Sequence, residues 1–198
     1  MNRVDLKVVL LGDASVGKTS LVRRYKNGTF TEEIFYQGTI GAAYVSKKIE
    51  HNDKSFIMGI WDTAGGERYD AMTKIYYRGA KAAVVCYDIT NLKTFQRAKF
   101  WIRELRVIED ACKIYICATK KDLLELGAIA NPDIDVVETY AKGVQAKFFT
   151  TSSKTGENVD ELFNVIAYDF IVDNPSVLNE REAINISTEP EKRSHCCS

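Results

Sequence analysis

One octapeptide near the amino end constrains this chain more than any other feature. It reads Gly12-Asp13-Ala14-Ser15-Val16-Gly17-Lys18-Thr19 and fits the pattern G-x-x-x-x-G-K-[ST], the P-loop. Glycines in such a loop let backbone N–H groups surround phosphate oxygens, while the lysine adds charge and the hydroxyl suits Mg²⁺. An apolar run, 4–11, precedes the loop and a helical pattern, 19–26, follows it. We therefore predict a phosphate site at a strand-to-helix turn, with a chance Gly-Lys turn as the alternative.

The rest of the chain alternates between strand-like and helix-like segments. We expect strands at 4–11, 42–50, 55–61, 82–87, 114–118 and 147–151. We expect helices at 19–26, 95–108, 134–141 and 159–171. This alternation predicts a parallel sheet with helices on both faces, an α/β architecture. Ligands of such folds bind beyond the carboxyl ends of the strands, so the loops there hold the candidate site.

The loop after the third predicted strand carries an acid and a glycine. Asp62 ends the strand, where a carboxylate opposite a P-loop can hold Mg²⁺ through water. Gly65 has no side chain to block its N–H, so that N–H can reach a terminal phosphate. The alternative is that Asp62 caps the next helix.

Two later loops are compatible with guanine, although neither is specific for it by itself. Asp122, in Thr119-Lys120-Lys121-Asp122, is an acceptor that guanine N1–H and N2–H₂ can satisfy and that adenine would leave unpaired. Lys120 can lay its stem over the base. The backbone of Ser152, Ser153 and Lys154 can meet guanine O6. A helix-capping acid and an ordinary Ser/Thr loop are the alternatives.

Composition bounds what else the chain can be. Its 198 residues carry 27 basic and 27 acidic side chains, a balance that argues against a dominant nucleic-acid surface. Five cysteines without zinc spacing fit a reducing, cytoplasmic compartment. Residues 173–198 contain no aromatic residue and no glycine. We therefore expect a folded domain at 1–172 and a flexible tail at 173–198.

The four loops, in this order, resemble the Ras superfamily of small GTPases, and the Rab branch most closely. The similarity to Rab proteins lies in Thr39-Ile40-Gly41, Tyr76-Tyr77-Arg78-Gly79-Ala80 and Tyr87-Asp88-Ile89-Thr90. Ile40-Gly41-Ala42-Ala43 and the helix around Arg97-Ala98-Lys99-Phe100-Trp101 resemble the divergent Rab twenty-four subgroup. The resemblance implies a P-loop NTPase fold with three layers and a six-stranded, mostly parallel sheet. It also implies GTP or GDP with Mg²⁺ as ligands.

The resemblance also assigns roles to individual residues. It implies Thr39, Gly65 and Lys18 as catalytic residues and Thr19, Thr39 and Asp62 as the metal site. It implies a nucleotide site of Gly12, Ala14, Ser15, Val16, Gly17, Lys18, Thr19, Ser20, Phe30, Thr39, Gly65, Thr119, Lys120, Asp122, Ser152, Ser153 and Lys154. Tyr44, Trp61 and Tyr76 resemble the aromatic triad that Rab proteins offer to effectors, with core packing as the alternative.

Two residues depart from the family pattern. Gly66 stands where relatives carry the glutamine that orients the attacking water, so we expect slow GTP hydrolysis. Thr119 stands where relatives carry asparagine. Because threonine is shorter and lacks an amide, we expect it to lose one tie between base and P-loop, with weaker nucleotide affinity.

The family pattern also implies a membrane role. Cys196 and Cys197 resemble the prenylated cysteine pair of Rab tails, which would place the protein on the cytosolic face of endomembranes. An unmodified tail with two reactive thiols is the alternative. The expected activity is that of a monomeric switch in vesicle trafficking, with autophagic membranes among its expected sites of action. Its expected partners are an exchange factor, a GTPase-activating protein, a dissociation inhibitor, an escort protein and effectors. The rival functions are a nucleotide-bound, non-hydrolysing scaffold and an ATP-dependent phosphotransferase.

Overall fold

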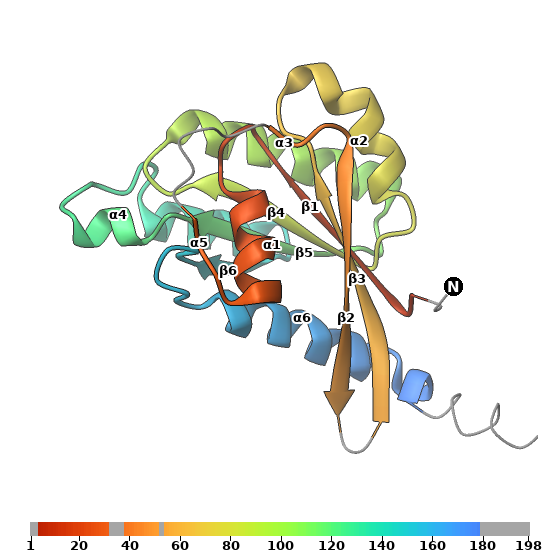
Figure 1. The fold of residues 1–198 in the computed structure, drawn as a ribbon. Coiled ribbons are helices and arrows are strands. Elements are labelled where there is room, and N and C mark those ends of the chain that lie inside the picture. Colours follow the sequence, from red (N-terminus) through yellow and green to blue (C-terminus); the bar gives the residue numbers. More distant parts are fainter. Residues whose placement is uncertain (1–3, 32–37, 52–53, 179–198) are drawn as a thin grey trace, which may run out of the picture.

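The computed structural model describes residues 4–31, 38–51 and 54–178. Its strands are β1 (Leu6–Gly12), β2 (Ala42–His51), β3 (Lys54–Thr63), β4 (Ala82–Asp88), β5 (Lys113–Thr119) and β6 (Lys147–Thr150). They form one sheet in the order β2-β3-β1-β4-β5-β6, in which only the β2–β3 pair is antiparallel (Figure 1). The predicted α/β fold with a six-stranded, mostly parallel sheet is confirmed.

Helices cover both faces of this sheet. They are α1 (Lys18–Asn27), α2 (Asp70–Tyr77), α3 (Leu92–Ile108), α4 (Asp122–Glu125), α5 (Ile134–Gly143) and α6 (Val159–Asp173), with 3₁₀ turns η1 (Glu67–Tyr69) and η2 (Pro175–Leu178). Side chains of β1 alternate between two cores. Val8 and Leu10 pack with α1 and α6, whereas Val9 and Leu11 pack with α2, α3 and α5. The strand period of two therefore builds three layers.

Two helices were not predicted from the sequence. Helix α2 buries only Thr73 and Tyr77, so its apolar pattern is too sparse to indicate a helix. Helix α4 is a single turn. Helix α3 begins at Leu92, three residues before the predicted start, because the Asn91 side chain accepts the Lys93 N–H and caps it.

The carboxyl end of the described chain packs on the first core. Helix α6 ends at Asp173, and Val177 of η2 lies against that core. The predicted domain boundary at 172 stays a prediction. None of the helices in the described ranges is long and apolar enough to cross a membrane. Cys196, Cys197 and the segment 32–37 lie outside the described residues.

Candidate functional site

The loops at the carboxyl ends of β1, β3 and β5 enclose two adjoining cavities. The first, of about 510 Å³, is lined by Ala14, Ser15, Gly17, Lys18, Thr19, Gly38, Thr39, Ile40, Thr63, Gly65 and Tyr69. The second, of about 430 Å³, is lined by Ser15, Gly17, Ser20, Phe30, Thr31, Thr119, Lys120, Asp122, Leu123, Ser153 and Lys154. Since Ser15 and Gly17 line both cavities, the two meet at the P-loop. One elongated molecule can therefore occupy both.

The P-loop wraps around its own lysine. Lys18 begins α1 and is 5% exposed. Its Nζ donates to the carbonyl oxygens of Gly12 at 3.0 Å and Asp13 at 2.6 Å. Burial lowers the pKa of this lysine, and nearby acidic groups, Asp62 among them, oppose that shift. The ammonium is thus fixed at the wall of the first cavity, where it can meet an anion.

Three oxygens from three different segments converge beside Lys18. The Thr19 hydroxyl donates to Asp62 Oδ2 at 2.7 Å. Because that proton is engaged, the Thr39 hydroxyl is the donor in its 3.0 Å contact with Thr19 Oγ1. Asp62 is 2% exposed, and its second oxygen, Oδ1, has no hydrogen-bond partner within the described part of the chain. Burial raises the pKa of Asp62 and outweighs the bond from Thr19.

Gly65 lies directly against the P-loop. A Cβ at this position would come within 2.5 Å of the Ala14 nitrogen and the Asp13 carbonyl oxygen. Only a glycine lets the β3 loop approach so closely, so its backbone N–H can serve the same cavity. Gly66 adopts a φ of +93°, a conformation that side-chain-bearing residues rarely take. Apart from its two neighbours in the chain, no described residue has an atom within 4 Å of where its Cβ would be.

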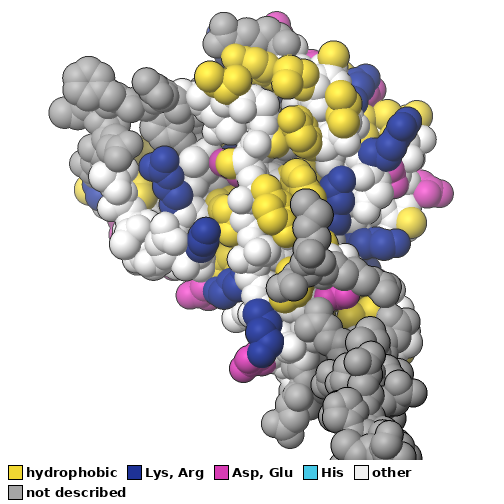
Figure 2. Space-filling model, turned by 45° about the vertical axis from the view of Figure 1, so that its right-hand side comes forward, with side chains coloured by type: hydrophobic (Ala, Val, Ile, Leu, Met, Phe, Trp, Pro, Cys, Tyr) yellow, Lys and Arg dark blue, Asp and Glu magenta, His cyan; other side chains and the backbone are white. Residues whose placement is uncertain are grey.

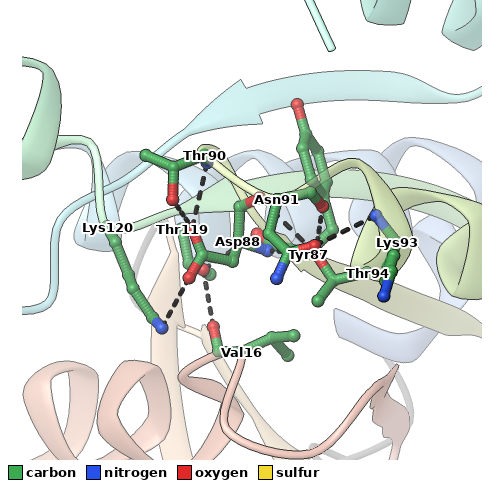
Figure 3. Close-up of polar contacts among 9 residues, drawn as sticks. All are labelled: Val16, Tyr87, Asp88, Thr90, Asn91, Lys93, Thr94, Thr119 and Lys120. Atoms are coloured by element: carbon green, nitrogen blue, oxygen red, sulfur yellow. Dashed lines mark hydrogen bonds and ion pairs between the residues drawn. The ribbon is translucent and has the colours of Figure 1, made fainter. Parts of the chain in front are cut away.

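The base-facing residues are held by bonds within the protein. The Ser152 hydroxyl donates to Asp122 Oδ1 at 2.6 Å. Lys120 donates to Asp88 Oδ2 at 2.6 Å, and Thr90 donates to Asp88 Oδ1 from both its N–H and its hydroxyl (Figure 3). Burial alone would raise the pKa of Asp88, but these bonds together hold it below its ordinary value.

The two capping alternatives for the acids are wrong. The turn after Asp62 begins with Gly66 as its cap, and Asp122 is the first residue of α4 rather than its cap. Asp122 lines the second cavity, and Asp62 contacts Thr19, which lines the first. Four predicted site residues line neither of these two cavities, but each contacts a residue that was also predicted for the site. Gly12 contacts Lys18, Val16 contacts Thr119, Asp62 contacts Thr19, and Ser152 contacts Asp122.

Comparison with known proteins identifies the fold family. The family model described as "Ras family" matches residues 7–171. "Ras-related protein Rab-24" of Dictyostelium discoideum is 45% identical over 201 residues, which cover 98% of each chain. The chain is a small GTPase of the Ras family, of the Rab type. Members of this family bind GTP and GDP with Mg²⁺ and hydrolyse GTP.

The oxygen cluster of this Rab protein fits a magnesium ion. Mg²⁺ prefers hydroxyl and carboxylate oxygens. Asp62 Oδ1, which has no hydrogen-bond partner among the described residues, is a buried acceptor of the kind that a cation satisfies. Thr19, Thr39 and Asp62 would hold the ion, directly or through water. When bound, it would neutralise charge on phosphate oxygens.

The expectation for Thr119 is partly wrong. Its hydroxyl lies 2.5 Å from the Val16 carbonyl oxygen and 2.9 Å from that of Tyr87 (Figure 3). The shorter side chain thus keeps a tie to the P-loop, because β5 runs close enough for a hydroxyl to reach it.

Sequence reasoning missed three residues around the site. Arg24 of α1 donates to the carbonyl oxygens of Ser153 at 2.6 Å, Lys154 at 2.5 Å and Gly28 at 2.6 Å, and so braces the base loop. Asp88 anchors Lys120. Tyr69 lines the phosphate cavity. None of them belongs to a phosphate or base motif, so no local pattern marked its role.

The three aromatic residues assigned to effectors lie near one surface. Tyr44 of β2 is exposed and its ring lies 4.9 Å from that of half-buried Trp61. The Tyr76 hydroxyl and Met72 both approach Gly41. Figure 2 shows apolar side chains gathered on the face formed by β2, β3 and α2. Trp61 also packs on the second core, so both roles weighed for it are compatible.

Proposed function

We propose that this chain is a Rab-type switch that stays long in its GTP form and regulates membrane trafficking, including autophagic membranes. The observation that carries the proposal is the contact of Thr39 with Thr19, whose hydroxyl in turn donates to Asp62, at the cavity that Gly65 also lines. A γ-phosphate would order the segments around Thr39 and Gly65, and its loss would release them. The apolar face near Tyr44 would then change with the nucleotide.

Slow hydrolysis follows from Gly66. Hydrolysis requires a water molecule held in line with the γ-phosphate, and Gly66 brings no group to hold it. Lys18 and the N–H of Gly65 still stabilise the charge that develops on the phosphate oxygens. The cavity therefore favours binding over turnover. A non-hydrolysing scaffold is the second candidate, and Gly66 favours it equally.

Single-turnover GTP hydrolysis of the full chain separates the two candidates. We expect measurable but slow release of phosphate, and an increase of about tenfold or more in Gly66→Gln, since one preorganised group contributes roughly 10²-fold. Gly66→Ala is the matched control, because it strains the same backbone without supplying an amide. No phosphate release with or without cell extract supports the scaffold. Equal rates in the two variants contradict the assigned role of Gly66.

Membrane attachment would come from Cys196 and Cys197. The carboxyl-terminal residues 173–198 hold no basic cluster, so lipid would supply most of the membrane affinity. The proposed partners are an escort protein, a dissociation inhibitor, an exchange factor, a GTPase-activating protein and effectors, acting on a monomer. Mass spectrometry of the protein from cells tests this, with isoprenoid adducts on the pair as the expected result. Unmodified thiols contradict it.

A further inference from the structure

Thr119 has one hydroxyl proton and two buried protein acceptors for it. The residue is 2% exposed at the end of β5. Its Oγ1 lies within hydrogen-bond distance of the Val16 and Tyr87 carbonyl oxygens (Figure 3). A hydroxyl donates a single proton. Any third acceptor next to the Thr119 side chain therefore finds no free hydroxyl proton there.

The cavities fix which part of a guanine base meets Thr119. The phosphates belong to the cavity of Lys18, so the ribose passes Ser15 and Gly17, where the two cavities join. The base is attached to ribose through its five-membered ring. That ring must lie at the P-loop end, where the Thr119 hydroxyl contacts Val16. Asp122 then faces N1 and N2 on the six-membered ring.

The side chain of Lys120, the next residue after Thr119, is also engaged within the protein. The ammonium of Lys120 is paired with Asp88 Oδ2, and Thr90 holds the other oxygen of that carboxylate. Lys120 itself has a positive φ of 62°, which fixes the direction of its side chain away from the regular strand. The stem of Lys120 can cover the base while its charge remains with Asp88.

We infer that this protein recognises guanine through N1, N2 and O6 and makes no hydrogen bond to N7. This inference rests on the proposed nucleotide binding and narrows its substrate class. Guanine nucleotides in which carbon replaces N7, with the shape of the ring kept, should bind as well as ordinary ones. Asparagine at position 119 would change this, because its amide carries two protons and can serve both the P-loop carbonyl and N7.

Competition binding with GDP and 7-deaza-GDP, in which carbon replaces N7, tests the inference. We expect wild-type affinities within about twofold of each other, because no bond is lost. Thr119→Asn should prefer GDP about fivefold to tenfold, the scale of one hydrogen bond. Thr119→Val, which has no hydroxyl, should weaken both ligands equally. Circular dichroism melts confirm that each variant is folded.

The outcomes are separable. A wild-type preference of tenfold or more for GDP over 7-deaza-GDP overturns the inference and leaves the proposed function intact. Failure of wild-type protein to bind GDP refutes the proposed function and the inference with it. If Thr119→Asn does not fold, the wild-type ratio decides alone.

Discussion

The two ends of the cavity system differ in how their polar groups are satisfied. At the phosphate end, Asp62 keeps a buried oxygen without a partner among the described residues, and Lys18 is held at the wall. At the base end, Thr119, Lys120 and Asp122 each already contact the protein. At the phosphate end, a ligand would offset the cost of burying the Asp62 carboxylate. At the base end, it would meet side chains that the protein already holds in place. We therefore assign most of the affinity to the phosphate end and selectivity to the base end.

The largest effect is expected at the phosphate end. Lys18→Ala removes a buried charge that meets phosphate, so GDP affinity should fall roughly 10²- to 10³-fold. Fluorescence titration with a labelled GDP measures the loss. Lys26→Ala, an exposed lysine of the same helix, is the control and should bind like wild type. Affinity retained within threefold in Lys18→Ala would contradict the assignment.

Asp169 is a buried carboxylate outside both cavities, and it can be compared with Asp62. Asp169 of α6 accepts from Tyr115 at 2.8 Å and from Lys147 at 2.7 Å. Burial alone would raise its pKa, but these two partners hold the pKa below the ordinary value. Asp169 thus differs from Asp62, whose pKa is raised. Asp169 should stabilise the fold without affecting the affinity for nucleotide.

The stability of Asp169→Asn should depend on pH. The folded pKa is lower than the unfolded one, so the charged form contributes stability above about pH 3.9 and loses it as pH falls through the folded pKa. Denaturant unfolding at pH 7 should show a loss of about 1–2 kcal/mol, shrinking toward pH 3. Asp173→Asn, which breaks only an exposed pair with Lys113, should change the unfolding free energy less. An equal loss at pH 7 and pH 3 would be inconsistent with this assignment.

A smaller effect is expected from Arg24, which holds the loop of Ser153 and Lys154 at the base end. Arg24→Met removes three bonds to backbone carbonyls, two of them on Ser153 and Lys154. The variant makes this loop more mobile but leaves its residues in place, so GDP should dissociate only about threefold to tenfold faster. Stopped-flow release of labelled GDP measures the rate. Arg103→Met, an exposed arginine with a local bond to Lys99, should leave release unchanged.

Local patterns predicted the layers and the motif residues, but not the contacts that join distant segments. Strands and long helices followed from apolar spacing, and the P-loop pattern predicted the turn between β1 and α1. The tie from Thr119 to Val16 depends on how closely β5 passes the P-loop, which no local pattern encodes. The same holds for Arg24, whose partner Ser153 lies 129 residues away in the chain. Helix α2 was not predicted because only two of its residues are buried, which leaves no apolar periodicity in the sequence.

The most direct test of the account is the affinity of the purified full chain for GTP and ATP, with and without Mg²⁺. GTP should bind at least about 10²-fold more tightly than ATP, because adenine leaves Asp122 unpaired. Chelation of Mg²⁺ should weaken the affinity for GTP severalfold or more. Without the cation, Asp62 Oδ1 would again have no partner among the described residues. In Asp122→Ala the preference for GTP should collapse while the magnesium effect remains. Equal affinity of the wild-type protein for GTP and ATP would contradict the account.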